Sequence, residues 1–313
     1  MDGIRKEAVP GVYISFAFRE RKVICMTHDC IPQIGFIGAG RAGCSLGMYF
    51  KNHGLNVSGY YSRTKSSARF AASFTDTVYY DSMIKLVSEC KIIFITVSDS
   101  SIGEVWNTIK NTDITGKIIC HTSGALSSLI FSDIELLGAY GYSLHPLCAI
   151  SSKTESYKIL NDVYFTIEGS SRMLDYMVSL ITSLGNRISV ISPSDKEKYH
   201  ASAVFASNLV NALFSSACDL LTQCGFTEND AHAAISSLFI NNSKAITESG
   251  TVAALTGPVD RNDITTVKKH LNVLCGDYRK IYELLSLRLI KTAQIKNPHT
   301  DYADMNNILQ NGE

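Results

Sequence analysis

The sequence lacks an excess of either charge. Its 313 residues contain 29 Lys and Arg residues and 29 Asp and Glu residues, so the formal net charge is zero. A protein that binds nucleic acid non-specifically usually carries a basic excess or a basic patch. We therefore expect no nucleic acid among the partners of this chain.

Paired cysteine motifs are also missing. The nine cysteines are odd in number, and no two of them have the C-x-x-C spacing. This pattern disfavours a disulfide framework and a structural zinc site, and we predict no metal site. Reduced thiols suit a cytoplasmic protein, in which most cysteines serve as small core residues.

Neither a secretory signal nor a clear membrane span is present. The first 30 residues carry scattered charges and no clean apolar segment. We expect Met26 to be the natural start, and residues 1–25 to be an extension with little structural role. The stretch 201–218 is uncharged, but its Ser and Asn residues and its short length favour a buried helix at a core or subunit interface.

What the sequence does have is a regular alternation of strand-like and helical segments. The strand-like segments are 34–38, 57–61, 78–80, 91–97, 117–120, 139–144, 163–168 and 187–191. This alternation predicts an α/β fold class with a Rossmann-like, doubly wound, mainly parallel sheet. Helical patterns at 194–224, 228–249, 263–274 and 277–293 predict an all-α C-terminal domain.

The most specific motif lies where the first strand ends and a helix begins. Its sequence is Gly38-Ala39-Gly40-Arg41-Ala42-Gly43, which has the G-x-G-x-x-G spacing of dinucleotide-binding turns. The first glycine permits a tight turn, the second lets the backbone approach a pyrophosphate, and the third lets the helix pack on the strand. The helix N-terminus then attracts the phosphates. The alternative is a glycine-rich turn that binds no ligand.

The end of the second strand distinguishes the two nicotinamide dinucleotides. NAD-binding turns usually place an Asp or Glu there, bonded to the ribose 2′-hydroxyl, but no carboxylate occurs between Arg41 and Thr75. Ser62, Arg63 and Thr64 end this strand instead. A guanidinium and two hydroxyls suit a 2′-phosphate, so we predict NADP as the cofactor. A solvated basic loop is the alternative.

These motifs set the expected domain organisation. We expect an N-terminal extension over residues 1–31 and an NADP-binding Rossmann-like domain over residues 32–193. A helical domain for substrate binding and dimerisation should follow over residues 194–296. Residues 297–313 are polar and should form a frayed tail.

Three other loops follow strands, and ligands of open α/β sheets lie at the carboxyl ends of the strands. We predict that Val97-Ser98-Asp99 runs beside the cofactor. The loop with His121 and Ser123 offers hydroxyls and backbone groups that could hold a substrate carboxylate or carbonyl. His145 precedes a proline, where its imidazole would lie near the substrate. Plain turn chemistry is the alternative for each loop.

The helical region supplies further candidates. On a single helix, His200, Ser207 and Asn208 would share nearly one face. A reductase needs a proton donor for the atom that becomes anionic as hydride arrives, which suits His200, and Asn208 could orient a carbonyl. A core histidine is the alternative. Arg261 could clamp a substrate carboxylate, or pair with Asp263 in a structural ion pair.

Together these motifs resemble those of bacterial oxidoreductases that join a Rossmann-like domain to a helical C-terminal domain of unknown function. The shared motifs are Gly38 to Gly43, His121 to Ala125, His145 to Leu147, Tyr199 to Ala201 with Ser207 and Asn208, and Leu255 to Pro258 with Arg261 and Asp263. The resemblance covers about residues 32–293. More distantly, the layout resembles the 6-phosphogluconate dehydrogenase-like superfamily, which includes ketopantoate reductase and pyrroline-5-carboxylate reductase.

The superfamily resemblance implies a helical C-terminal domain that dimerises. Many members that act on 2-oxo or 3-hydroxy acids place a catalytic lysine four residues before an asparagine. Here His200 lies in the comparable region and position 204 is Val204. A lysine mechanism would therefore require Lys196 or Lys198 to reach the site.

These observations predict an NADP-dependent oxidoreductase that reduces a small carboxylate-bearing carbonyl or imine, with a 2-oxo acid of the ketopantoate type as the best candidate. The predicted catalytic residues are His200, Asn208, Ser123, His145 and Arg261. We expect a small-molecule substrate, a homodimer and no membrane partner. The alternatives are hydride transfer between NADPH and a flavin or deazaflavin, and a non-catalytic NADP-sensing module.

Overall fold

The computed structural model describes residues 32–311, which divide into two compact units. The α/β unit ends at Glu197, and the helical unit begins at Lys198. This boundary lies four residues beyond the predicted one. The predicted N-terminal extension and the proposed start at Met26 lie outside the described residues.

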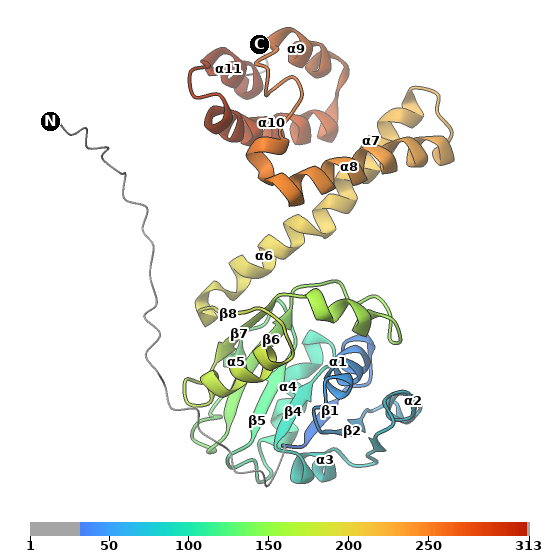
Figure 1. Ribbon diagram of the computed structural model, residues 1–313, viewed down its shortest axis with the longest axis vertical. Coiled ribbons are helices and arrows are strands. Elements are labelled where there is room, and N and C mark those ends of the chain that lie inside the picture. The colour runs from blue at the N-terminus through green and yellow to red at the C-terminus, as the bar shows by residue number, and fades with distance from the viewer. Residues whose placement is uncertain (1–31, 312–313) are drawn as a thin grey trace, which may run out of the picture. The chain divides into compact units, whose positions relative to one another are not determined.

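An eight-stranded sheet forms the centre of the α/β unit (Figure 1). Its strands are β1 (Ile34–Ile37), β2 (Val57–Tyr61), β3 (Val78–Tyr79), β4 (Ile92–Ile95), β5 (Ile118–His121), β6 (Tyr140–Pro146), β7 (Phe165–Gly169) and β8 (Ile188–Val190). Their spatial order is β3-β2-β1-β4-β5-β6-β7-β8, and β6 pairs with β7 in the antiparallel direction while the other pairs are parallel. The first six strands have the order of the doubly wound dinucleotide-binding fold. The predicted fold class is confirmed.

Helices cover both faces of this sheet, so two hydrophobic cores form. One core contains side chains of α1 (Arg41–Asn52), α2 (Lys65–Thr75), α5 (Leu174–Ser183) and the 3-10 helix η2 (Ser156–Asp162). The other contains side chains of α3 (Met83–Glu89) and α4 (Asp99–Ile109), and of the segment that follows the 3-10 helix η1 (Ser128–Ile130). The central strands β1 and β4 are buried along their whole length, as their uninterrupted apolar sequences require.

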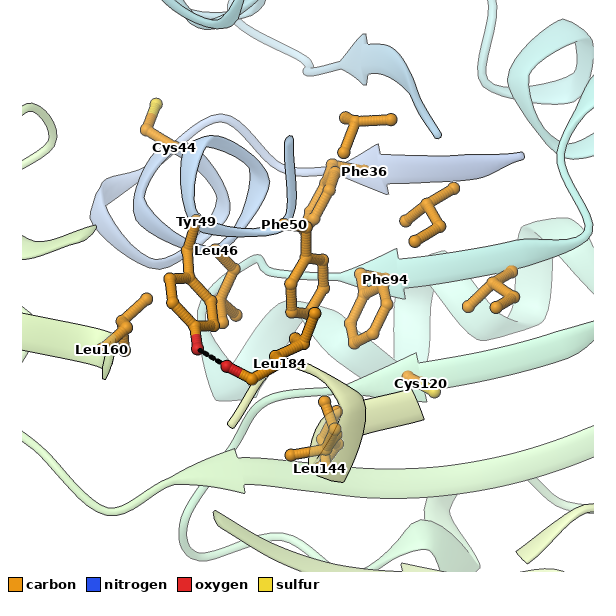
Figure 2. Close-up of a cluster of buried hydrophobic side chains, with 14 of the residues drawn as sticks. Phe36, Cys44, Leu46, Tyr49, Phe50, Phe94, Cys120, Leu144, Leu160 and Leu184 are labelled. Carbon is orange, nitrogen blue, oxygen red and sulfur yellow. Dashed lines mark hydrogen bonds between the residues drawn. The ribbon is translucent and has the colours of Figure 1, made fainter. Parts of the chain in front are cut away.

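Aromatic side chains join α1 to the central strands (Figure 2). Phe36 of β1 stacks on Phe94 of β4 with 5.4 Å between the ring centroids, and Phe50 of α1 contacts both rings. Tyr49 crosses this core and donates a hydrogen bond to the carbonyl of Leu184. Because each buried aromatic ring contributes about 1.5–3 kcal/mol, this packing holds the C-terminal half of α1 against the central strands.

The helical unit is built from α7 to α11, and α6 (Lys196–Ala206) leads into it. Its helices are α7 (Asn208–Gln223), α8 (Glu228–Ala254), α9 (Ile264–Val273), α10 (Gly276–Lys296) and α11 (Ala303–Asn311). A core forms between the loop after α8 and the helices α9, α10 and α11. Helix α8 is kinked at Gly250, where φ is +83°.

Two predictions about this region are wrong. Residues 297–313 were expected to fray, but α11 forms and buries Met305, Ile308 and Leu309 in the core of the helical unit. Their spacing of three to four residues gives a narrow apolar stripe within an otherwise polar sequence. The predicted continuous helix over 194–224 is interrupted at Ser207, whose φ and ψ of −129° and −77° end α6 and start α7.

The stretch from Pro193 to Gln223 also differs from expectation. By length and composition alone it is apolar enough to cross a membrane, and none of its apolar window is buried within the part of the chain that the structure describes. A helix buried in the core of this chain is therefore wrong for this stretch. Burial at a subunit interface stays a prediction.

Candidate functional site

Two glycines of the turn between β1 and α1 are required by packing. Gly38 has a φ of +115°, and a Cβ there would lie 2.6 Å from the carbonyl oxygen of Thr96. A Cβ on Gly43 would meet the carbonyl of Gly38 and the Thr96 hydroxyl. That hydroxyl donates a 2.9 Å hydrogen bond to the Gly38 carbonyl, so the turn is tied to the end of β4.

Gly40, in contrast, is not required by packing. A Cβ on Gly40 would have no atom within 4 Å, so the fold itself leaves room for a side chain at this position. Gly40 is the N-cap of α1, and no side chain caps the first turn of that helix. The N–H groups of this turn and the positive end of the helix dipole are therefore available to an anion.

A cavity of about 290 Å³ lies beside this turn, at the ends of β1, β2 and β4. Its lining residues are Ile37, Gly38, Tyr61, Ser62, Arg63, Thr64, Met83, Val97, Ser98, Ser101, Glu104, Val105 and Thr108. The structure thus brings together Gly38, the Ser62–Thr64 segment and the Val97–Ser98 segment. The sequence predicts that all three contact the cofactor. The contributions of α3 and α4, Met83 and Glu104, were not foreseen.

The end of β2 presents one basic side chain to this cavity. Arg63 and Thr64 are exposed, and the Ser62 hydroxyl accepts a hydrogen bond from the Thr64 N–H at 3.3 Å. Thr64 is the N-cap of α2, whose first turn also has no side-chain cap. Arg69 lies over the ring of Tyr79 at 5.2 Å, so Arg63 is the arginine that lines the cavity.

Three buried polar residues form a row across neighbouring strands. His121 of β5 pairs with Ser143 of β6, which pairs with Glu168 of β7. Residues directly opposite one another in a sheet point to the same face, so these side chains lie side by side near the carboxyl end of β5. All three are almost completely inaccessible to solvent.

Asp99 links the loop that follows β5 to α4, a helix that lines the cavity. It is the first residue of α4 and lies directly after the Val97–Ser98 segment. Its carboxylate accepts a 2.8 Å hydrogen bond from the Ser123 hydroxyl, and that hydroxyl accepts hydrogen bonds from the N–H groups of Ala125 and Leu126. Ser123 therefore shapes its loop, and its predicted contact with substrate stays a prediction.

Glu168 anchors the other end of the same loop. One carboxylate oxygen accepts a 2.7 Å hydrogen bond from the Ser128 N–H, and the other accepts a 2.6 Å hydrogen bond from the Ser128 hydroxyl. The loop that begins at His121 is thus held by a carboxylate at each end, Asp99 near its start and Glu168 near η1.

Lys196 is the cation of this cluster, and its side chain is only 1% exposed. Burial lowers the pKa of Lys196 to about 8, against the raising effect of the carboxylates of Glu168 and Asp99. Burial also lowers the pKa of His121 to about 4, against the raising effect of the Ser127 backbone. The imidazole is therefore neutral at pH 7, and Lys196 is the group poised to change charge near neutrality.

The remaining predicted residues belong to other elements of the chain. His145 is a half-buried residue of β6. His200, Asn208 and Arg261 belong to the helical unit, and the break at Ser207 means that His200 and Asn208 are not on one continuous helix. Asp263 caps α9, because its carboxylate accepts hydrogen bonds from the N–H and the hydroxyl of Thr266. The catalytic roles of His145, His200, Asn208 and Arg261 stay predictions.

The sequence pattern assigned no role to Glu168, and it named Lys196 only as one of two lysines that a lysine mechanism would require. Glu168 ends an apolar strand pattern, where a carboxylate is unusual, and Lys196 stands where the helical pattern begins. The position of Glu168 was the available signal, because a charge inside a buried strand needs a partner.

Two family models match successive parts of the chain, and the second begins within the α/β unit. A model for a Rossmann-like domain matches residues 26–146, and a model for a domain of unknown function, DUF2520, matches residues 163–289. The chain joins a Rossmann-like domain to a DUF2520 domain. The DUF2520 match includes β7, so that both Glu168 and Lys196 lie within it.

Solved structures show the same fold. A Bacteroides fragilis protein provisionally named an NADP oxidoreductase is 23% identical, covering 83% of this chain and 98% of its own, with a TM-score of 0.64. A Thermotoga maritima protein is 24% identical, covering 84% and 99%, with a TM-score of 0.66. Pyrroline carboxylate reductase from Plasmodium falciparum, solved with NADP bound, is 16% identical, covering 85% and 96%, with a TM-score of 0.54. No curated protein sequence is significantly similar to the chain.

Proposed function

We propose that this chain is an NADP-dependent oxidoreductase that reduces a carbon–oxygen or carbon–nitrogen double bond in a small carboxylate-bearing molecule. The observation that carries the proposal is the open Gly40 position at an uncapped helix N-terminus, beside a cavity that Arg63 lines. The names of two similar structures, an NADP oxidoreductase and a pyrroline carboxylate reductase with NADP bound, support the same cofactor class.

The cofactor's parts fit distinct groups of this chain. The pyrophosphate would lie over Gly40 and accept hydrogen bonds from the N–H groups in the first turn of α1. The adenosine half would occupy the 290 Å³ cavity, with its 2′-phosphate facing Arg63, Thr64 and the uncapped start of α2. Bound there, the cofactor would supply a hydride at the carboxyl ends of β4 and β5.

Gly40→Ala separates ligand binding from folding. Its Cβ would enter open space, so we expect the melting temperature to stay within about 2 °C of wild type. The same Cβ would stand where the pyrophosphate approaches the backbone, so the NADPH dissociation constant should rise at least about tenfold. Gly43→Ala is the matched control, because its Cβ meets the Gly38 carbonyl and should lower the melting temperature by several degrees. Equal NADPH affinity in Gly40→Ala and wild type would contradict the placement.

We propose Lys196 as the proton donor. The oxygen or nitrogen of the reduced bond gains a proton as hydride arrives, and a useful donor has a pKa near the working pH. Lys196 has a pKa of about 8, so it is mainly protonated at pH 7. Because burial favours its neutral form, losing the proton costs less than it would at an exposed lysine. His200 is the second candidate.

The substrate class can be tested by direct reduction. A 2-oxo acid of the ketopantoate type is the first candidate, and the pyrroline carboxylate reductase among the similar structures adds cyclic imino acids. The test is the oxidation of NADPH by purified protein, followed at 340 nm with both substrate sets. Turnover of neither set, at saturating NADPH, would contradict this proposed substrate class.

We propose that α7 and α8 form the interface of a homodimer. No residue of α7 is buried, and large apolar side chains such as Leu209, Leu213, Leu238 and Ile240 are exposed on the two helices. An exposed apolar surface of this kind marks an interaction site. We expect a dimer in sedimentation velocity and a monomer for Leu238→Lys. Leu136→Lys, on the α/β unit, should stay dimeric, and a monomeric wild type would refute the interface.

We also propose a cytoplasmic location. The cysteines among residues 32–311 are all free thiols, which suits a reducing compartment. A reductase that consumes NADPH also requires the reduced cofactor pool of the cytoplasm. Cell fractionation with detection of the full chain tests this location, and recovery from an exported fraction would contradict it.

A further inference from the structure

Glu168 is a carboxylate in a position where a strand normally carries an apolar residue. It lies on β7, next to Ser143 in register, and is 1% exposed. Both carboxylate oxygens accept hydrogen bonds from Ser128, so its hydrogen-bonding needs are met by the start of η1. Hydrogen bonds alone do not neutralise a buried charge, and such a charge requires an opposite charge nearby.

Lys196 supplies that opposite charge. The Ile191 N–H donates a hydrogen bond to the carbonyl of Ile167, the residue before Glu168, and Lys196 is buried five residues further along in the same unit. The charges of Glu168 and Asp99 both act on its ammonium there. Lys196 also acts on His121, which is neutral at pH 7. Of the two carboxylates, Asp99 is exposed to solvent and Glu168 is buried. The charge of Glu168 is less screened by water and should act on Lys196 more strongly.

We propose that Glu168 is a positioning residue of the site, whose buried carboxylate both anchors the η1 turn through Ser128 and supplies the counter-charge that keeps Lys196 protonated for proton delivery. The proposal rests on the role of Lys196 proposed above and adds the group that controls it. A purely structural Glu168 would hold η1 in place but leave the titration of Lys196 unchanged.

Two variants separate these roles. Glu168→Gln has nearly the same shape, and its amide can still accept the Ser128 N–H and bond to the Ser128 hydroxyl, but it carries no charge. Ser128→Ala removes one hydrogen bond to Glu168 and leaves the charge in place. We therefore expect Glu168→Gln to change the titration of Lys196, and Ser128→Ala to change it little.

The experiment is an NMR titration of the full chain labelled with ¹³C and ¹⁵N in lysine. The Lys196 side-chain signal is assigned as the one missing in Lys196→Met. We expect it to titrate near pH 8 in the wild type, and about one pKa unit lower in Glu168→Gln. The Ser128→Ala and Glu168→Asp proteins should stay close to wild type. Should Glu168→Gln fail to fold, Glu168→Met takes its place, because it also removes the charge, and an unchanged Lys196 titration in that variant would overturn the proposal.

Other outcomes have equally definite meanings. An unchanged Lys196 titration in Glu168→Gln would show that Glu168 is structural only. This measurement needs neither NADPH nor substrate, so it stands apart from the proposed function. If NADPH fails to bind the same sample, the oxidoreductase proposal fails while the coupling between Glu168 and Lys196 is still measured.

Discussion

Replacing Lys196 with methionine should lower kcat for NADPH oxidation by about 100- to 10,000-fold, the usual contribution of a positioned proton donor. Methionine keeps most of the length of the side chain and its apolar contacts but cannot donate a proton. The NADPH dissociation constant should stay within about threefold of wild type, because Lys196 does not line the cofactor cavity. The measurement is steady-state kinetics with the substrate found in the reduction screen, together with a fluorescence titration with NADPH.

Lys198→Met is the matched control for this variant. Lys198 is exposed and lies two residues further along α6, so its loss should change kcat little. His200→Ala completes the comparison, since His200 is the other candidate donor. A large loss of kcat in His200→Ala with a normal rate in Lys196→Met would assign the proton to the histidine.

The pH dependence of the wild type follows from the same residue. The reaction in the direction of reduction needs Lys196 in its protonated form, which is populated below its pKa of about 8. The value of kcat/KM should therefore be level from pH 6 to 7 and fall about tenfold per pH unit above pH 8. In Lys196→Met this fall should disappear. A fall in the wild type centred near pH 6.5 would indicate a histidine of ordinary pKa instead.

Arg63→Glu should reverse the choice between NADPH and NADH. Removing a charged hydrogen bond to the 2′-phosphate and adding a repelling carboxylate should raise the NADPH dissociation constant about 100-fold. The NADH dissociation constant should change less than about threefold, because NADH has no 2′-phosphate to repel. Titration of the variant with each dinucleotide measures both constants.

Arg69→Glu is the control for that experiment. Arg69 is a second arginine of the same region, but it lies over the ring of Tyr79 and does not line the cavity. It should leave the ratio of the two dissociation constants near its wild-type value. Equal weakening of NADPH and NADH by Arg63→Glu would mean that Arg63 does not contact the 2′-phosphate.

The fold was predictable because its signals are local. The central strands β1 and β4 are apolar runs between turn residues, and the spacing of Gly38, Gly40 and Gly43 matches that of a dinucleotide-binding turn. That Ser62 to Thr64 and Val97 to Ser98 line one cavity was predictable for the same reason, since the carboxyl ends of neighbouring parallel strands lie together in any sheet of this order.

The buried charged cluster of Glu168 and Lys196 was not predictable, because it depends on contacts between distant segments. Glu168 and Ser128 are 40 residues apart in sequence, and they meet because β7 runs antiparallel to β6. Nothing local in Lys196 distinguishes a buried ammonium from the exposed one of Lys198. The fraying predicted after residue 297 failed for a related reason, since Met305 and Leu309 reveal their role only once α9 and α10 provide a surface to cover.

The central claim is that the turn between β1 and α1 binds NADP. The most direct test is a fluorescence titration of the purified full chain with NADPH and, separately, with NADH. We expect saturable binding of NADPH with a dissociation constant at least about tenfold below that for NADH, as a contact to the 2′-phosphate requires. Absence of binding by either dinucleotide would contradict the account at its foundation and leave a Rossmann-like scaffold with some other role.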